Sequence, residues 1–291
     1  DRGKQLIIKA SENGADAIKF PPFKANKLVT KDVPRFWEQN KQGTTQISLY
    51  ETQDDLTKEE YLELVDLCKK KNIIFLSTPF DEDSVEFLEE LDVPAYKIAS
   101  TDLTNIPFLR YVARKGKPMI LSVGMGSIGE IEEAVSAIRR EGNDDVVLLH
   151  CMVIYPTPAE QANVNFMQTL QKLYPDYPVG FSDHTLGINV PVVAAALGAR
   201  VIEKHFTIDK NIKGAPDHPI SVDPEELREM VKGIREAQLC LGSGVRKITG
   251  EEIYAMQSGR RRIVANMDIP AGTRIEPYMI AMKRSIDGIY P

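Results

Sequence analysis

The sequence predicts an α/β fold, namely a (β/α)8 TIM barrel whose first strand is missing, followed by a small, partial β-rich tail. Two observations support this. Short apolar strands alternate with amphipathic helices along most of the chain, and polar residues recur where those strands end. Repeated strand–helix units without a long antiparallel section indicate a parallel sheet. Because the strand ends of a barrel converge on one mouth, these polar residues favour a barrel over an open doubly wound sheet, the competing fold.

The predicted elements follow in a regular order. A helix over 6–13 ends at Gly14, a strand covers 16–20, and a polar, proline-containing insertion spans 21–55. The next helix, 56–71, begins with Thr57 and Glu60 in the spacing of a capping box. The remaining strands are predicted at 72–77, 95–99, 119–123, 145–150, 179–185 and 199–206, and the remaining helices at 81–91, 106–115, 128–141, 165–174, 190–197 and 224–241.

The two ends of the chain depart from this repeat. The sequence opens inside a helical pattern, so we expect that a segment carrying the first strand precedes it. The barrel domain is predicted over residues 1–243 and the small domain over 256–291, with a glycine-containing connection between them and short strands at 262–265 and 279–282. A piece of this size is too short to hold a core alone, so it is expected to lean on the barrel or on another subunit.

Composition excludes several classes of partner. The net charge is −6, and the short cluster Arg260–Arg262 is too small for a nucleic-acid footprint. No apolar run approaches the roughly 20 residues of a membrane span, and no signal peptide is visible. Three distant cysteines indicate reduced thiols instead of a disulfide framework. These features predict a cytoplasmic protein with no nucleic-acid or membrane partner.

His184 and His205 end two consecutive predicted strands. Parallel neighbours lie roughly 4.8 Å apart, so two imidazoles on the same rim can share one divalent cation. Glu203 lies on the same strand face as His205 and could be a ligand or could orient an imidazole. The alternative is that both are ordinary strand-end histidines. His150, at the end of the preceding strand, is a weaker candidate.

Lys19 and Lys97 each lie inside an apolar strand. A buried lysine is costly unless an anion pairs with it, so the two lysines indicate a pocket for phosphate or carboxylate. Hydroxyl groups near the strand ends would add hydrogen bonds, and these belong to Thr78, Ser100, Ser122 and Ser182. Two alternatives remain: lysines that extend outward between helices, and a Schiff-base lysine at position 97.

Two sequence blocks are especially specific. Gly180–Thr185 reads Gly-Phe-Ser-Asp-His-Thr and Ile202–Thr207 reads Ile-Glu-Lys-His-Phe-Thr, which places the histidines 21 positions apart (205 − 184). Together with six further segments in the same order, they resemble the sialic acid synthase family, which condenses phosphoenolpyruvate with N-acetylmannosamine or related sugars. The further segments are 14–20, 77–81, 97–105, 149–151, 155–158 and 216–218.

The resemblance implies a role for each matching residue. His184 and His205 would hold a divalent metal, usually manganese or magnesium. Tyr155, Glu203 and Asp217 would contact or orient the sugar, and Glu203, Tyr155 and Lys97 are the expected catalytic residues. The phosphate and carboxylate of phosphoenolpyruvate would be bound by Lys19, Lys97, Thr78, Ser100, Ser122 and Ser182. The tail resembles the antifreeze-like (SAF) domain of the family. By this resemblance, Arg284 of the tail would reach into a partner's barrel in a swapped homodimer.

Three departures from the family pattern stand out. The family's first strand, which carries a glutamate and an Asn-His pair, has no counterpart here. Val153 occupies a position where many relatives have a polar residue. The tail ends at Pro291, about halfway through the expected small domain.

The implied activity is a metal-dependent, carbon–carbon bond-forming transfer that yields a nonulosonic acid and phosphate, as in polysaccharide biosynthesis. The acceptor sugar is open between N-acetylmannosamine, its 6-phosphate and a 2,4-diacetamido sugar. Two other functions remain: a Schiff-base aldolase acting on a pyruvate-type substrate through Lys97, and a truncated, non-catalytic sugar-binding or assembly module.

Overall fold

The computed structural model describes residues 2–22, 24–35, 45–51, 56–212 and 217–291. The chain divides into two compact units, Asp1–Leu241 and Gly242–Pro291. None of the helices formed by the described residues is long and apolar enough to cross a membrane.

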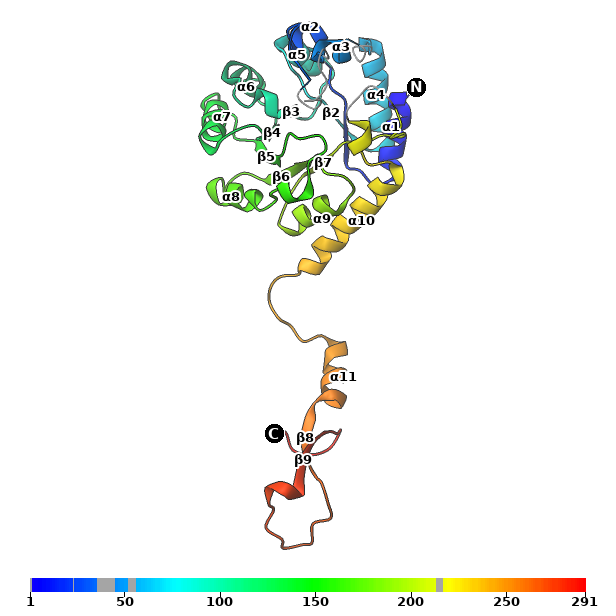
Figure 1. Cartoon of the computed structure of the whole chain (residues 1–291), viewed down its shortest axis with the longest axis vertical. Coiled ribbons are helices and arrows are strands. Elements are labelled where there is room, and N and C mark those ends of the chain that lie inside the picture. The colour runs from blue at the N-terminus through cyan, green and yellow to red at the C-terminus, as the bar shows by residue number, and fades with distance from the viewer. Residues whose placement is uncertain (1, 23, 36–44, 52–55, 213–216) are drawn as a thin grey trace. The chain divides into compact units, whose positions relative to one another are not determined.

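The first unit is built on parallel strands that follow chain order. Strands β1 (Ala17–Lys19) and β2 (Ile74–Leu76) pair with each other, and a parallel bridge from Ser77 to Tyr96 joins β2 to the next sheet. That sheet consists of β3 (Tyr96–Ile98), β4 (Met119–Ser122), β5 (Val146–Cys151), β6 (Val179–Asp183) and β7 (Ile202–Lys204), in that order. The predicted parallel α/β architecture is confirmed, and Figure 1 shows the strands gathered inside a ring of helices.

The ring of strands is open at one place in the described structure. No pairing joins β7 to β1 among the described residues, and a cavity of about 560 Å³ is lined by both strands and by helices α1 (Arg2–Glu12) and α10 (Pro224–Leu241). The missing first strand of an eight-stranded barrel stays a prediction.

The remaining helices of the first unit alternate with the strands. They are α4 (Lys58–Lys71), α5 (Glu82–Glu90), α6 (Ile106–Ala113), α7 (Ile128–Arg140), α8 (Phe166–Leu173) and α9 (Asn189–Ala196). The capping box predicted at Thr57 and Glu60 is confirmed at the start of α4. Two short helices, α2 (Ala25–Leu28) and α3 (Gln46–Tyr50), lie in the segment predicted only as an insertion, because four or five residues are too few to show a helical period.

The core lies between this sheet and the helices. In α7 the residues Ile131, Ala134, Val135 and Ile138 are buried, which is the three- and four-residue spacing of one helical face. The strands contribute side chains that are fully buried, including Tyr96, Ile98, Leu121, Leu148 and Phe181. Strands covered in this way are mostly apolar, so the polar residues within them and at their ends stand out.

The second unit contains helix α11 (Gly250–Gly259) and an antiparallel pair, β8 (Arg261–Ala265) and β9 (Ile280–Arg284). None of its residues is buried, so it has no core of its own. Helix α11 is absent from the sequence prediction, and the predicted domain start at 256 falls inside it. The signal was present, because Thr249 and Glu252 form a capping box at its start.

Candidate functional site

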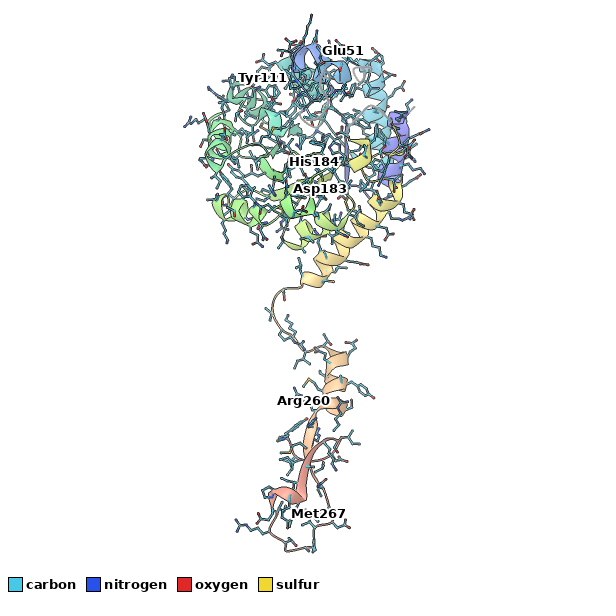
Figure 2. All side chains as sticks on the ribbon, viewed as in Figure 1. Glu51, Tyr111, Asp183, His184, Arg260 and Met267 are labelled. Atoms are coloured by element: carbon cyan, nitrogen blue, oxygen red, sulfur yellow. The ribbon has the colours of Figure 1, made fainter. Side chains whose placement is uncertain are left out.

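Strands β6 and β7 hold their polar residues in register. Ser182 lies opposite Glu203 and Asp183 opposite Lys204, and one residue further along each strand come His184 and His205. Gly180 permits this close pairing, since a Cβ there would lie 2.3 Å from the Val201 carbonyl oxygen. The imidazole centroids are 5.3 Å apart, with the rings tilted by 40°. The predicted proximity of the two histidines is therefore confirmed, and Figure 2 shows His184 near the middle of the first unit.

The surroundings of His184 suit a neutral imidazole. Its Nδ1 lies 2.7 Å from the Met152 carbonyl oxygen and donates to it, so the lone pair is on Nε2. Burial, and secondarily the nearby His205, lowers the pKa of His184 to about 4. The Tyr155 ring lies over this imidazole with centroids 4.2 Å apart. An imidazole whose second nitrogen is held by a carbonyl is the usual form of a metal-binding histidine.

The two imidazoles fit a divalent cation that takes its other ligands from water or substrate. Within the described part of the chain, no group of three or more histidine, cysteine or acidic residues could hold a metal ion. Glu203, left open as a ligand by its strand position, has other partners. Its Oε1 accepts a hydrogen bond of 2.7 Å from Ser182 Oγ and lies 3.7 Å from Lys97 Nζ.

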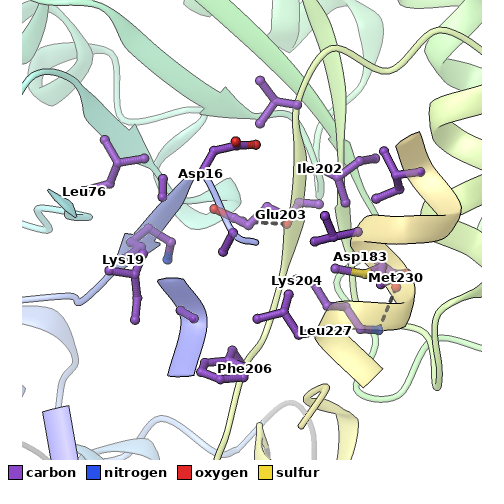
Figure 3. A pocket seen from close by; sticks show the side chains of 18 of the residues that line it. Asp16, Lys19, Leu76, Asp183, Ile202, Glu203, Lys204, Phe206, Leu227 and Met230 are labelled. Carbon is purple, nitrogen blue, oxygen red and sulfur yellow. Dashed lines mark hydrogen bonds and ion pairs between the residues drawn. The ribbon is translucent and has the colours of Figure 1, made fainter. Parts of the chain in front are cut away.

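Lys97 lies at the centre of the predicted anion pocket. Its side chain is buried, and Nζ donates to the Ile98 carbonyl at 2.9 Å and to Ser122 Oγ at 2.7 Å. Burial lowers its pKa, although Glu203 opposes that shift. Lys19 of β1 lies close enough to act electrostatically on both Lys97 and Glu203. The structure thus brings both predicted lysines to one carboxylate, and Figure 3 shows Lys19 and Glu203 lining the same cavity.

Glu203 is ionised in this setting. Burial alone would raise its pKa, but the charges of Lys97 and Lys19 and the Ser182 hydrogen bond hold it at about 2. The folded pKa lies below the ordinary value of 4.5, so the unfolded chain binds the proton more readily. The carboxylate therefore stabilises the fold above about pH 4.5, and this contribution is lost as the pH falls towards 2.

Glu203→Gln is expected to remove that pH dependence. The difference in unfolding free energy between wild type and variant should be largest above about pH 4.5 and shrink towards pH 2. Urea unfolding measured at several pH values tests this, with Glu236→Gln as a control on an exposed helix position. A difference that stays constant over the whole range would contradict the ionised state.

The four predicted hydroxyls lie in different surroundings. Ser122 and Ser182 are the partners of Lys97 and Glu203, and Ser100 Oγ accepts from the Gly124 amide at 3.1 Å. Thr78 is the exception, because its Oγ1 is buried and has no hydrogen-bond partner among the described residues. An unpaired buried hydroxyl costs about 1–3 kcal/mol, so it indicates a group that a ligand would satisfy.

Tyr155 and Asp217 lie on the side of the histidines. Tyr155 is also near His205, with ring centroids 6.0 Å apart. Burial raises the pKa of the Tyr155 hydroxyl, and the charges of Cys151, Asp217 and Glu203 raise it further. Asp217 thus belongs to the same electrostatic environment. The preceding residues 213–216 lie outside the described residues.

Two other predicted residues, His150 and Arg284, are not placed with the site residues described above. His150 is buried against Phe166 and Phe181, and its Nε2 lies 2.9 Å from the Ala162 carbonyl oxygen. These contacts favour a structural role for His150. Arg284 lies on β9 of the second unit, and its role in a partner's site stays a prediction.

Sequence reasoning missed three contributors to the site. The Met152 carbonyl could not be found, since any residue carries one. Asp183 and Lys204 were quoted only as parts of the family blocks, yet they form a buried ion pair between the two histidine strands. The available signal was two opposite charges at matching positions of consecutive strands.

A curled parallel sheet with lysines and paired imidazoles at its strand ends defines the class of α/β enzymes whose site lies at the carboxyl ends of the strands. The chain belongs to the NeuB family, whose profile matches residues 6–246. It is 41% identical over 294 residues to the N,N'-diacetyllegionaminic acid synthase of Legionella pneumophila, covering 99% of this chain and 82% of that protein.

Two further proteins extend the comparison. The N-acetylneuraminate-9-phosphate synthase of Mus musculus is 35% identical over 295 residues, covering 100% of this chain and 81% of that protein. The crystal structure of a sialic acid synthetase from Leptospira borgpetersenii has a TM-score of 0.76 and 35% identity, over 88% of this chain and 86% of that one. The chain is therefore an acid synthase, an enzyme that forms carbon–carbon bonds by a condensation of the sialic-acid type.

Proposed function

We propose that this enzyme condenses phosphoenolpyruvate with an N-acyl amino sugar, using a divalent cation, Mn²⁺ or Mg²⁺, held by His184 and His205. The observation that carries the proposal is that residues able to bind a metal lie directly beside residues able to bind an anion. The two imidazoles directly follow, along the same strands, the Ser182–Glu203 pair that meets buried Lys97. The names of the relatives support an acceptor such as N-acetylmannosamine, its 6-phosphate or a 2,4-diacetamido sugar.

The protein's own groups prepare the anionic substrate. A lysine ammonium has three donors, and Ile98 and Ser122 engage two of those of Lys97. The third is left to face an anion, either Glu203 or an incoming phosphate or carboxylate. Lys19 adds a second positive charge, and the Thr78 hydroxyl adds a donor with no competing partner among the described residues.

The reaction then needs three changes at the bound substrates. The enol carbon of phosphoenolpyruvate attacks the open-chain aldehyde of the sugar, water adds to C2, and phosphate leaves with cleavage of its C–O bond. A bound cation would supply Lewis acidity at the aldehyde oxygen. Lys97 and Lys19 stabilise the charge on the departing phosphate, while Tyr155 and Asp217 position the sugar beside the imidazoles.

The direct test is release of inorganic phosphate from phosphoenolpyruvate and N-acetylmannosamine, measured with Mn²⁺ and then with excess EDTA. We expect release that depends on both substrates and stops with chelation. Substituting the diacetamido sugar or the 6-phosphate identifies the acceptor. Turnover that ignores EDTA would contradict the metal role, and no phosphate release with any acceptor would contradict the condensation.

Thr78→Val is expected to separate binding from stability. The valine has nearly the same shape and removes a buried hydroxyl without a partner among the described residues, so the unfolding midpoint should stay constant or rise. A lost hydrogen bond to a charged substrate should raise the KM for phosphoenolpyruvate roughly 10-fold or more. Steady-state kinetics and thermal unfolding provide both values. A lower midpoint with unchanged KM would show that the hydroxyl serves the fold.

A second function is favoured by one observation. The pKa of Lys97 is lowered by burial, and a neutral amine is the nucleophile of a Schiff-base aldolase. Borohydride reduction in the presence of pyruvate would trap a covalent adduct on such a lysine. We expect none, because the carboxylate of Glu203 and the Ser122 hydroxyl hold the ammonium form. A stable adduct at Lys97 would reverse this assignment.

We also propose that Gly242–Pro291 is part of an antifreeze-like (SAF) domain that serves a swapped homodimer through Arg284. Its support is the absence of any buried residue in this unit, which leaves apolar side chains such as Tyr254, Ile275 and Tyr278 exposed. The cytoplasmic location stays a prediction.

A further inference from the structure

Asp183 and Lys204 form an ion pair that the proposed chemistry does not use. Lys204 Nζ lies 2.7 Å from Asp183 Oδ2, and their side chains are 2% and 0% exposed. Strand alternation directs them away from Ser182, Glu203 and the histidines. Figure 3 shows the pair beside Leu227 and Met230 of α10, in apolar surroundings.

Stability alone does not account for such a pair. Removing two charges from water carries a desolvation cost that their attraction only partly offsets, and well-packed apolar replacements are often as stable. A buried ion pair does hold the two strands that carry it together, because separating the charges would leave each one unpaired in an environment where that is costly. The position of the pair along β6 and β7 therefore indicates which part of the two strands it holds together.

The pair occupies the last rung of the β6–β7 ladder. The register runs from Phe181 and Ile202 to Asp183 and Lys204, and it ends there. His184 and His205 come immediately after it, where no backbone pairing between the two strands sets their separation. The side-chain pair is thus the final link between the strands before the imidazoles.

The pair also encloses the backbone of His184. The Thr185 amide donates to Asp183 Oδ1 at 3.0 Å, and Thr185 Oγ1 donates to Asp183 Oδ2 at 3.1 Å. Lys204 Nζ donates in addition to the Thr185 carbonyl oxygen. His184 lies between the two residues that this network joins, so its main chain is held on both sides.

We propose that Asp183 and Lys204 are positioning residues that set the separation and orientation of the His184 and His205 imidazoles for a shared divalent cation. The cation belongs to the proposed function, on which this inference rests. The placement of the rings does not depend on a bound metal, so it can be measured separately.

The test compares the near-isosteric double variant Asp183→Asn/Lys204→Met with the wild-type protein. A matched control is Glu89→Gln/Lys117→Met, which removes a partly buried pair of 2.9 Å between α5 and the segment before β4. Two readouts are used. Long-range ¹H–¹⁵N spectra of the imidazoles, assigned with His184→Gln, report the His184 tautomer without metal, and Mn²⁺ titration followed by electron paramagnetic resonance reports affinity.

We expect the wild type and the control to keep His184 as one Nδ1–H tautomer. The double variant should show mixed tautomers or exchange broadening, and Mn²⁺ affinity about 10- to 100-fold weaker, the usual effect of losing an outer partner of a metal ligand. A single Nδ1–H tautomer in the double variant would overturn the proposal. If the wild type binds no Mn²⁺, the metal role of the proposed function fails, and the tautomer spectra still decide this inference.

A milder variant covers the case in which the double variant does not fold. Thr185→Val removes one hydrogen bond to Asp183 and keeps the ion pair, whereas Thr185→Ser retains the hydroxyl. We expect the valine to broaden the His184 signals and the serine to restore them. Identical imidazole spectra for valine, serine and wild type would count against a positioning role.

Discussion

Replacing His205 with alanine is expected to abolish specific Mn²⁺ binding and to lower kcat/KM for the condensation by at least about 10³-fold. The reason is that the structure offers only two neighbouring imidazoles, and the described part of the chain holds no group of three potential metal-ligating side chains to compensate for a lost one. A single histidine cannot hold a divalent cation in a defined geometry. Mn²⁺ titration and phosphate release measure the two effects.

His218→Gln is the control for this prediction. His218 Nδ1 lies 2.9 Å from Thr207 Oγ1, so its ring is held by a hydroxyl group instead of another imidazole. The variant should bind Mn²⁺ as the wild type does. Equal loss of Mn²⁺ binding in both variants would point to a general effect of removing histidine, and unchanged binding in His205→Ala would refute the proposed ligand pair.

Lys97→Met is expected to lower both activity and stability. The Glu203 side chain is 27% exposed and would lose its nearest cation. Breaking a fully buried pair typically costs about 3–5 kcal/mol, so a smaller loss of stability is expected here. Loss of a preorganised charge beside the departing phosphate should lower kcat by about 10²- to 10³-fold. Urea unfolding at pH 7 and phosphate-release kinetics are the measurements.

The double variant Lys97→Met/Glu203→Gln separates the two effects of that change. Removing the carboxylate charge as well should restore much of the stability while leaving the enzyme inactive, because the unpaired charge is gone but the anion pocket is still lost. Lys115→Met, which removes an ion pair with Glu86 on the surface, should leave activity unchanged. Recovery of activity in the double variant would refute the role of Lys97 in binding the anion.

Much of the fold follows from local rules. The spacing of Thr57 and Glu60 marks the start of α4, and the buried stripe of α7 repeats at helical period. Short helices such as α2 are not predicted by these rules. Helix α11 was missed because the glycines beside it were interpreted as a flexible connection. In each case the local signal was too short or was outweighed by residues that favour turns.

The two histidines could be predicted as neighbours because a strand–helix–strand unit places consecutive strands side by side. The same rule puts Ser182 opposite Glu203, since strand side chains alternate with a period of two. This rule predicts neither the unpaired hydroxyl of Thr78 nor the hydrogen bond of the Met152 carbonyl. Whether a hydroxyl lacks a partner, and which carbonyl accepts from an imidazole, depends on atoms from segments far apart in sequence.

The sequence by itself determined the parallel α/β class, the order of its strands and the family to which the chain belongs, since these depend on periodicity and on blocks of adjacent residues. The tertiary structure alone decided the partners: Glu203 with Lys97, His184 with Met152, and Asp183 with Lys204. The physical reason is that burial and Coulomb interactions act through space at a few ångströms. The residues that set the charge and orientation of each site group therefore come from different strands and from the loops that follow them.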